Sequence, residues 1–171
     1  DVCSSDLPDG STYYKHKNHK CNITEIEQYL LTNLHDFTDS HTVICGDLNA
    51  RTGEQNNVPS RLDDNDNVNP SLQACVDDDD IPLDDRSSQD TIVNSFGKLL
   101  IDLSYAFNLF IANGRVYGDL KGEYTFNGQQ GSSVNDYFIC SPYFYQFINL
   151  LNIGDRVDSD HLPLELSCCF P

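Results

Sequence analysis

Basic residues are scarce in this chain, and methionine and tryptophan are absent. Ten Lys and Arg stand against 27 Asp and Glu over 171 residues, which gives a formal net charge of −17 at pH 7. Nucleic-acid-binding domains usually carry a positive surface, so the charge argues against a conventional domain of that class. No apolar run approaches the ~20 residues that a membrane-spanning helix needs, and we therefore expect no membrane as a partner.

Hydrophobic residues nevertheless make up 39% of the chain and aromatic residues 11%. That content is too high for a disordered polyelectrolyte. The length fits one domain with a core and is too short for two ordinary domains, so we expect a single domain over residues 1–171. Because the chain begins at Asp1 and lacks methionine, we also expect it to be a piece of a longer protein.

The seven cysteines include no CxxC pair and follow no regular spacing. An odd number without pairs fits a reduced, intracellular setting better than a disulfide framework. Cys45 and Cys140 lie inside apolar stretches, and we expect both to be small core residues.

Hydrophobic periodicity predicts a mixed, layered fold. Apolar residues at helical spacing predict one helix over 24–35, where Thr24 and Glu27 have capping-box spacing, and another from about 92 to 107. Short apolar or alternating stretches predict strands at 42–45, 109–112, 124–126, 133–140 and 162–168. Gly114, Gly118 and Gly122 are expected in turns. Because helices and strands interleave, we expect layers of both around one core.

A long polar segment over 51–92 separates the first predicted strand from the second helix. Nine aspartates lie between Asp63 and Asp85, and four of them, Asp77 to Asp80, are consecutive. Mutual repulsion and low hydrophobicity predict an exposed, mobile acidic loop, which we delimit at 61–86.

The first candidate for chemistry follows the apolar strand at 42–45, in the string Gly46-Asp47-Leu48-Asn49. Residues two apart on an extended backbone point the same way, so Asp47 and Asn49 are expected to share a face. A carboxylate that can hold a proton beside an amide that can bind an oxygen suits a phosphate ester. Taken alone, the string is also typical of a simple turn.

Two further candidates sit at strand ends. Asp136 is expected to face the interior with Val134, so it must be buried and paired, whether in a site or in a bond to a neighbouring loop. Asp160 and His161 enter the last predicted strand, and such a pair can supply a metal ligand and a phosphate contact, although a lone pair is often incidental. Each signal is weak alone, but the three in this order are strong.

Together these strings resemble the endonuclease/exonuclease/phosphatase superfamily. The resemblance rests on V-I-C-G-D-L-N at 43–49, S-S-V-N-D-Y at 132–137 and S-D-H-L-P-L at 159–164. A narrower resemblance is to the endonuclease domains of LINE-type (non-LTR) retrotransposons and their craniofacial-development-protein-2-like relatives. It rests on G-D-L-N-A-R-T-G (46–53), on the string R-S-S-Q-D-T-I-V-N-S-F-G-K-L-L (86–100) and on N-G-R-V-Y-G-D-L-K-G-E-Y-T-F (113–126).

The resemblance implies an α+β fold, a four-layer α/β/β/α sandwich of the deoxyribonuclease I type, with its active site at one rim. It also implies that activated water cleaves a phosphodiester with Mg²⁺ or Mn²⁺ as cofactor. The implied roles are a proton carrier in Asp47, a phosphate contact in Asn49, a metal ligand in Asp160 and a phosphate contact in His161, whose ring Asp136 would orient. Thr125 and Ser159 are weaker candidates near the rim.

One departure from the superfamily pattern concerns the metal. Relatives have an early Asn-containing strand and a Gln-Glu motif whose glutamate is the principal metal ligand, and neither is found in this chain. Glu25 and Glu27 fall on a predicted helix, and Glu54 follows the Asp47 motif. We therefore expect the sandwich to be incomplete at its N-terminus and the metal site of this chain to lack that ligand.

Three functions follow as hypotheses. The leading one is a retroelement-type DNA endonuclease domain, with DNA as substrate, a reverse transcriptase domain in the parent polypeptide and a nuclear location. The second keeps the fold but acts on a small phosphodiester or a phosphoinositide. The third is a non-catalytic relic, or an acidic module whose aspartates at 63–85 bind cations or a basic partner.

Overall fold

Helices and antiparallel strands alternate along the chain in the computed structural model, which describes residues 22–33, 42–55 and 85–170. This confirms the expected α+β class. The elements, in order, are α2 (Asn22–Asn33), β1 (Val43–Asp47), α4 (Ser95–Ala106), β2 (Phe110–Ile111), β3 (Phe126–Gly128), β4 (Gly131–Ser133), β5 (Asp136–Cys140), α5 (Pro142–Tyr145), β6 (Ile148–Ile153) and β7 (Leu164–Cys168).

A three-stranded antiparallel sheet forms the centre, in the order β1-β5-β2. β5 is the middle strand, and its register places Cys140 opposite both Val43 of β1 and Phe110 of β2. At the other end of the same ladder, Asp47 lies opposite Asp136. Two separate hairpins, β3–β4 and β6–β7, complete the strands among the described residues.

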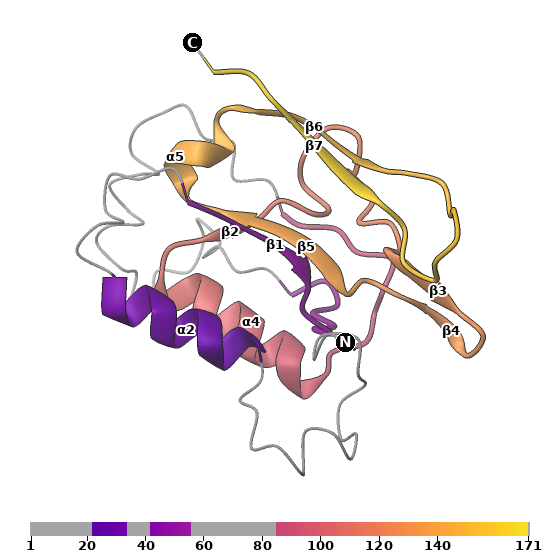
Figure 1. Cartoon of the computed structure of the whole chain (residues 1–171), viewed down its shortest axis with the longest axis horizontal. Coiled ribbons are helices and arrows are strands. Elements are labelled where there is room, and N and C mark those ends of the chain that lie inside the picture. The colour runs from indigo at the N-terminus through magenta and orange to yellow at the C-terminus, as the bar shows by residue number, and fades with distance from the viewer. Residues whose placement is uncertain (1–21, 34–41, 56–84, 171) are drawn as a thin grey trace.

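Both faces of this sheet are covered (Figure 1). Helices α2 and α4 lie on one face, where the buried side chains of the two helices pack against Ile111, Tyr137 and Ile139. The β6–β7 hairpin and α5 lie on the other face, where Phe110 and Cys140 contact their apolar side chains. The successive layers are therefore a helix pair, a sheet and a second, two-stranded sheet.

Helix α4 begins at Ser95, three residues later than predicted, because Asn94 caps it. The Asn94 side chain accepts hydrogen bonds from the backbone N–H groups of Gly97 (2.7 Å) and Arg51 (3.0 Å). One cap thus fixes the start of the helix and the segment that follows β1. Gly97 is needed at this contact, since a Cβ there would lie 1.8 Å from the carbonyl oxygen of Arg51.

The single strand predicted over 133–140 is divided into β4 and β5. The backbone N–H of Val134 donates to the Asp90 carboxylate (3.1 Å), and that of Asn135 donates to the Thr125 hydroxyl (2.9 Å). Because side chains take these donors, no neighbouring strand can, and the ladder stops for two residues.

Three sequence expectations about burial are corrected or limited. Cys45 is exposed because β1 is an edge strand among the described residues, whereas Cys140 on the central strand is 1% exposed, as predicted. The polar segment 51–92 is not exposed at its ends, since Thr52 and Asp90 are buried. The acidic loop predicted at 61–86 lies outside the described residues up to residue 84; of its last two residues, Asp85 is exposed but Arg86 is buried, so the exposed loop ends before Arg86.

Other predictions of local structure have mixed outcomes. Gly114, Gly118 and Gly122 have positive φ angles, which confirms the turns. Helix α5 and strand β6 were not predicted. The first is a single turn over Pro142–Tyr145 capped by Ser141, and such a short element leaves no periodic signal.

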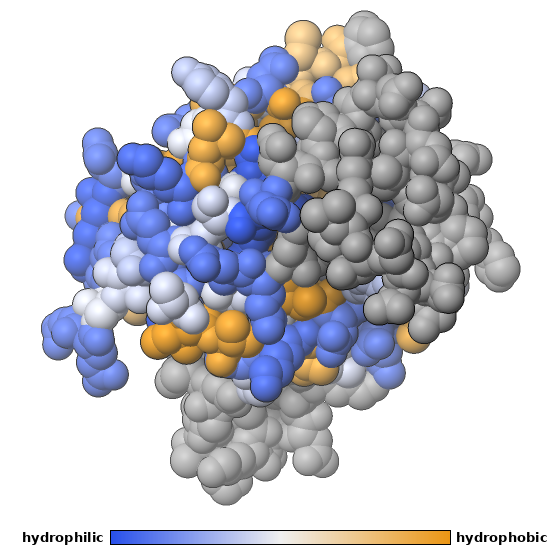
Figure 2. Space-filling view, turned by 180° about the vertical axis from the view of Figure 1, so that it is seen from behind, coloured by the Kyte–Doolittle hydropathy of each residue, from blue (hydrophilic) through white to orange (hydrophobic). Residues whose placement is uncertain are grey.

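Hydrophilic residues predominate among the coloured residues on the face of the molecule shown in Figure 2, and hydrophobic residues form small, separate patches there. Within the described part of the chain, no helix combines the length and the apolar character needed to span a bilayer.

Candidate functional site

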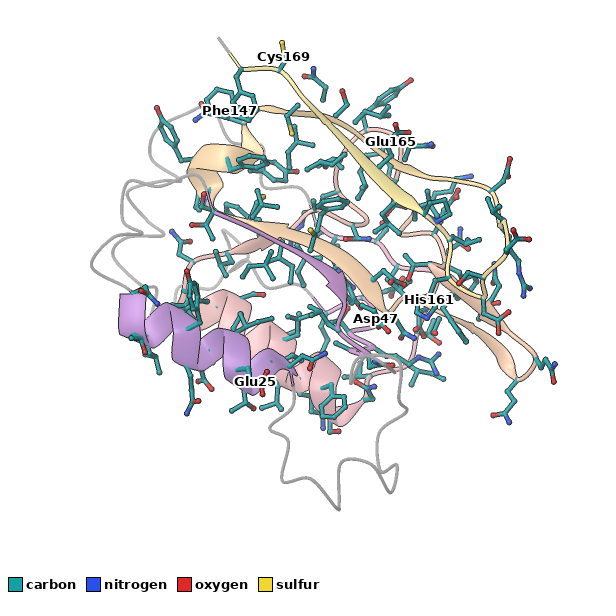
Figure 3. The ribbon with its side chains drawn as sticks, in the orientation of Figure 1. Glu25, Asp47, Phe147, His161, Glu165 and Cys169 are labelled. Atoms are coloured by element: carbon teal, nitrogen blue, oxygen red, sulfur yellow. The ribbon has the colours of Figure 1, made fainter. Side chains whose placement is uncertain are left out.

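Two carboxylates and an imidazole meet at one end of the three-stranded sheet. Asp47 ends β1, Asp136 begins β5, and His161 precedes β7. One ligand atom of each side chain lies within 4.8 Å of those of the other two. Figure 3 shows Asp47 and His161 side by side at this end of the sheet. Three segments far apart in the sequence thus form one group of side chains that can hold a metal ion.

Two neighbours contact the His161 ring, and two further contacts hold its backbone. Its Nδ1 atom lies 3.1 and 3.0 Å from the two carboxylate oxygens of Asp136. The ring of Phe126 meets it edge to face at 5.0 Å between centroids, and the backbone of Phe126 forms a bridge with that of His161. The His161 backbone N–H donates to the Ser159 hydroxyl (3.1 Å). The ring therefore has a defined orientation at the rim.

That orientation turns the second ring nitrogen toward Asp47. Nε2 of His161 lies 3.9 Å from Oδ2 of Asp47, which is too long for a direct hydrogen bond. The His161 side chain is 34% exposed, against 12% for Asp47 and 15% for Asp136. The histidine is thus the most accessible member of the group.

Asp47 and Asn49 are brought together by a turn rather than by an extended strand. Asn49 has a φ of 50°, in the left-handed region, so the predicted shared face of a strand is wrong. Its backbone N–H donates to Oδ1 of Asp47 (2.9 Å), and its side-chain amide donates to Oδ2 (3.3 Å). Both bonds fix the carboxylate of Asp47 beside the other two groups.

Thr125 lies beneath the group and is completely buried. Its hydroxyl accepts hydrogen bonds from the backbone N–H groups of Asn135 (2.9 Å) and Asp136 (3.0 Å). Its backbone carbonyl accepts a hydrogen bond from the N–H of Leu162 (2.7 Å). Thr125 thus links the segment that carries Asp136 to the segment that carries His161.

Asp160 and Ser159 lie beside the group rather than in it. Asp160 forms an ion pair with Arg156, and its side chain is 47% exposed. Its backbone carbonyl accepts from the N–H of Asn127 (2.7 Å). The role of Asp160 as a metal ligand stays a prediction, and it would require the carboxylate to leave Arg156. Ser159 supports the backbone of His161, as described above.

Asn113 also supports the site, and the sequence patterns assigned it no role. It is 2% exposed, its side-chain amide donates to the carbonyl of Asp136 (3.2 Å), and its amide oxygen accepts from the N–H of Phe138 (2.9 Å). It follows a short apolar stretch, as Asp47 does at the end of β1. A polar residue after an apolar strand was the only available signal.

An ion pair between the buried Asp90 carboxylate and the partly exposed Arg51 lies at the same end of the sheet. Both oxygens of Asp90 accept from Arg51, at 2.8 and 2.7 Å, and Asp90 also accepts from the backbone N–H of Val134. Burial by itself would raise the pKa of Asp90, but the hydrogen bonds from Arg51 and from backbone N–H groups outweigh it and lower the pKa. Asp90 is therefore a buried anion that fixes the chain two residues before Asp136.

A buried cation, Arg86, lies beside this pair. The Arg86 guanidinium donates to the Thr52 hydroxyl at 2.8 and 2.6 Å and also to the carbonyl of Gly53. Burial lowers the pKa of Arg86. These bonds connect the segment that follows β1 to the segment that precedes α4.

Comparison with models of known protein families gives no match, and comparison with curated protein sequences gives none either.

Proposed function

We propose that this chain is a metal-dependent phosphodiesterase domain of the retroelement DNA endonuclease type, with Asp47, Asp136 and His161 as its site. The observation that carries the proposal is the contact of His161 Nδ1 with the Asp136 carboxylate at 3.0 Å. The two motifs that make this contact are 25 residues apart, and the resemblance of the sequence implies the same pairing.

The donor set fits Mg²⁺ or Mn²⁺. Carboxylates are the protein ligands that both ions accept, whereas an imidazole favours Mn²⁺ over Mg²⁺ among the two. Asp47 and Asp136 would hold the cation, and His161 is either a third ligand or a phosphate contact. A bound ion would polarise the phosphate and lower the pKa of a bound water.

The chain's own residues divide the remaining work. Asp136 holds the Nδ1–H tautomer of His161, so that Nε2 faces the substrate side. Nε2 donates a hydrogen bond to a phosphate oxygen when the ring carries a second proton, with the negative Asp136 carboxylate favouring that protonated form. Asp47, whose Oδ2 lies 3.9 Å from that nitrogen, would bind the cation with one carboxylate oxygen and use the other to take the proton of the attacking water or to return one to the leaving oxygen. Asn49 keeps Asp47 in place through two hydrogen bonds.

The layer order supports the finer fold that we propose. A four-layer sandwich of the deoxyribonuclease I type has a helix layer, two sheets and a second helix layer. The α2–α4 pair, the three-stranded sheet and the β6–β7 hairpin correspond to the first three layers. We also propose DNA as the substrate, a nuclear location and a reverse transcriptase domain in the same polypeptide.

Plasmid nicking tests the proposal. Supercoiled plasmid is incubated with the chain, and separately with a form extended upstream, in Mn²⁺, in Mg²⁺ and in excess chelator. We expect cation-dependent nicking that Asp47→Asn abolishes, while Asp155→Asn, at an exposed aspartate in the loop before His161, leaves it unchanged. A small aryl phosphodiester run in parallel separates a nuclease from an enzyme of small diesters.

If both forms are inert on both substrates, the proposal is wrong. Nicking that survives in chelator, or that Asp47→Asn does not change, would also contradict it. Hydrolysis of the small diester without nicking would keep the site and replace the substrate.

A further inference from the structure

We infer that Arg156 is a positioning residue for His161, an inference that rests on the proposed function for its activity readout only. Arg156 donates from Nε to the carbonyl of Ser159 (2.9 Å) and from Nη1 to the carbonyl of Asn127 (3.2 Å), and its Nη2 pairs with the Asp160 carboxylate. One guanidinium thus binds three acceptors on two segments.

Those segments are the two that border the histidine. Residues 159–162 lie along residues 125–127, where the N–H of Asn127 donates to the carbonyl of Asp160 and the N–H of Leu162 donates to the carbonyl of Thr125, both at 2.7 Å. His161 lies between these two bonds and contacts Phe126. Arg156 binds the backbone carbonyls of Asn127 and Ser159, next to the Asn127–Asp160 hydrogen bond that ends this short ladder.

The geometry of the guanidinium explains why an arginine stands here. Its five N–H donors form a fixed planar fork, so one side chain can bind three acceptors in set directions. A lysine carries the same charge but has no such fork. At this position the fixed directions of the N–H donors therefore matter, and a positive charge alone is not sufficient.

Arg156 is also accessible enough to change without unfolding the domain. Its side chain is 52% exposed and that of Asp160 is 47% exposed. Exposed ion pairs add little to stability. The three bonds therefore determine where the loop and His161 lie more than whether the chain folds.

The test uses the ring nitrogens of His161. Long-range ¹H–¹⁵N spectra of the metal-free chain, recorded under mildly alkaline conditions in which imidazoles are neutral, report which nitrogen carries the proton. His161→Gln removes the signal and so assigns it. We expect the His161 ring of the wild type to be in the Nδ1–H tautomer and to give one sharp set of signals. Arg156→Ala and Arg156→Lys should both give a mixture of tautomers or broadened signals, with unchanged circular dichroism.

Two results would overturn the inference. One is a wild-type ring signal that persists in Arg156→Ala. The other is a normal signal in Arg156→Lys alongside a changed one in Arg156→Ala, because that pattern would assign the effect to charge. Asp155→Asn, in the same loop, is the matched control and should give the wild-type spectrum.

Activity separates this inference from the proposed function. Where the wild type nicks plasmid, Arg156→Ala and Arg156→Lys should lower the rate by about 10- to 100-fold, as misplacement of a reacting group does. If the ring signal changes in the Arg156 variants but the wild type does not nick plasmid, the positioning role is supported and the proposed function is contradicted. Normal nicking by both variants would leave the function and remove the positioning role.

Discussion

The Asp136 carboxylate and the His161 ring are in contact, and one buried residue, Thr125, links the two segments that carry them. His161 Nδ1 lies 3.0 Å from Oδ2 of Asp136. Thr125 accepts hydrogen bonds from the backbone of Asp136 with its hydroxyl and from the backbone of Leu162 with its carbonyl. The site is thus built on a buried threonine that binds the backbone beside both groups.

Replacing Thr125 by valine is expected to destabilise the chain although the two side chains have nearly the same shape. Valine removes the hydroxyl that accepts from the N–H groups of Asn135 and Asp136, and both donors are left without it in a buried place. An unsatisfied buried donor costs about 1–3 kcal/mol, so we expect a loss of at least about 2 kcal/mol in urea unfolding.

Thr125→Ser is the matched control. Serine keeps the hydroxyl and loses a methyl group, which costs about 1 kcal/mol as a small cavity. We therefore expect the Thr125→Ser variant to be more stable than the Thr125→Val variant. The opposite order would mean that packing, not the two hydrogen bonds, is the role of Thr125.

Much of the site was predictable because its chemistry is local. Asp47 ends β1, Asp136 begins β5 and His161 precedes β7, and residue type together with the order of the motifs singled them out as candidates, although the expected metal ligand was Asp160. The division of 133–140 into two strands was not predictable, because it depends on Asp90, which accepts the N–H of Val134 from 44 residues away. Hydrophobic alternation carries no information about such a bond.

The Asp90–Arg51 pair predicts a pH dependence. The pKa of Asp90 is lowered from the ordinary 3.8 in the folded chain. A carboxylate with a depressed folded-state pKa contributes stability above its unfolded pKa, and that contribution is lost as the pH falls through the folded value. Asp90→Asn should cost about 3 kcal/mol near neutral pH, because it leaves Arg51 and buried donors poorly paired.

The measurement is the free energy of unfolding in urea for the wild type and for Asp90→Asn from neutral pH down to below 3.8. The difference between the two proteins should be constant at neutral pH and shrink below that value. A difference that stays constant to the lowest pH would show that Asp90 does not act as a buried anion.

Gly97→Ala should reverse the usual sign of a glycine substitution in a helix. Alanine normally stabilises a helix interior by about 0.5–1 kcal/mol relative to glycine. Here the new Cβ would lie 1.8 Å from the Arg51 carbonyl oxygen and 3.1 Å from the Thr52 nitrogen. Because backbone must move, we expect a loss of about 2 kcal/mol or more in thermal or urea unfolding.

Lys98→Ala, at the exposed neighbouring position of α4, controls for helix propensity and should be nearly neutral. A stabilised Gly97→Ala variant would contradict the close approach of α4 to the segment after β1. No sequence pattern indicated this approach, since an isolated glycine in a helical pattern has many causes. The same is true of Cys45, whose exposure follows from the position of β1 at a sheet edge.

Cation binding can be measured apart from catalysis. Calorimetric titration of the chain with Mn²⁺ should give one saturable site, which Asp47→Asn and Asp136→Asn each weaken at least about tenfold. Asp155→Asn should bind like the wild type. Asp160→Asn discriminates between two versions of the site, because it weakens binding only if Asp160 leaves Arg156 to become a ligand. Equal binding by the wild type, Asp47→Asn and Asp136→Asn would remove this group as the metal site.

If the His161–Asp136 contact serves phosphodiester cleavage, the initial rate of plasmid nicking in Mn²⁺ depends on both side chains. His161→Gln and Asp136→Asn are compared with the wild type in the shortest form of the polypeptide that nicks. We expect each variant to lower the rate at least about 100-fold while its melting temperature changes little. Rates within about threefold of the wild type, a difference worth less than ~1 kcal/mol of barrier, would contradict it.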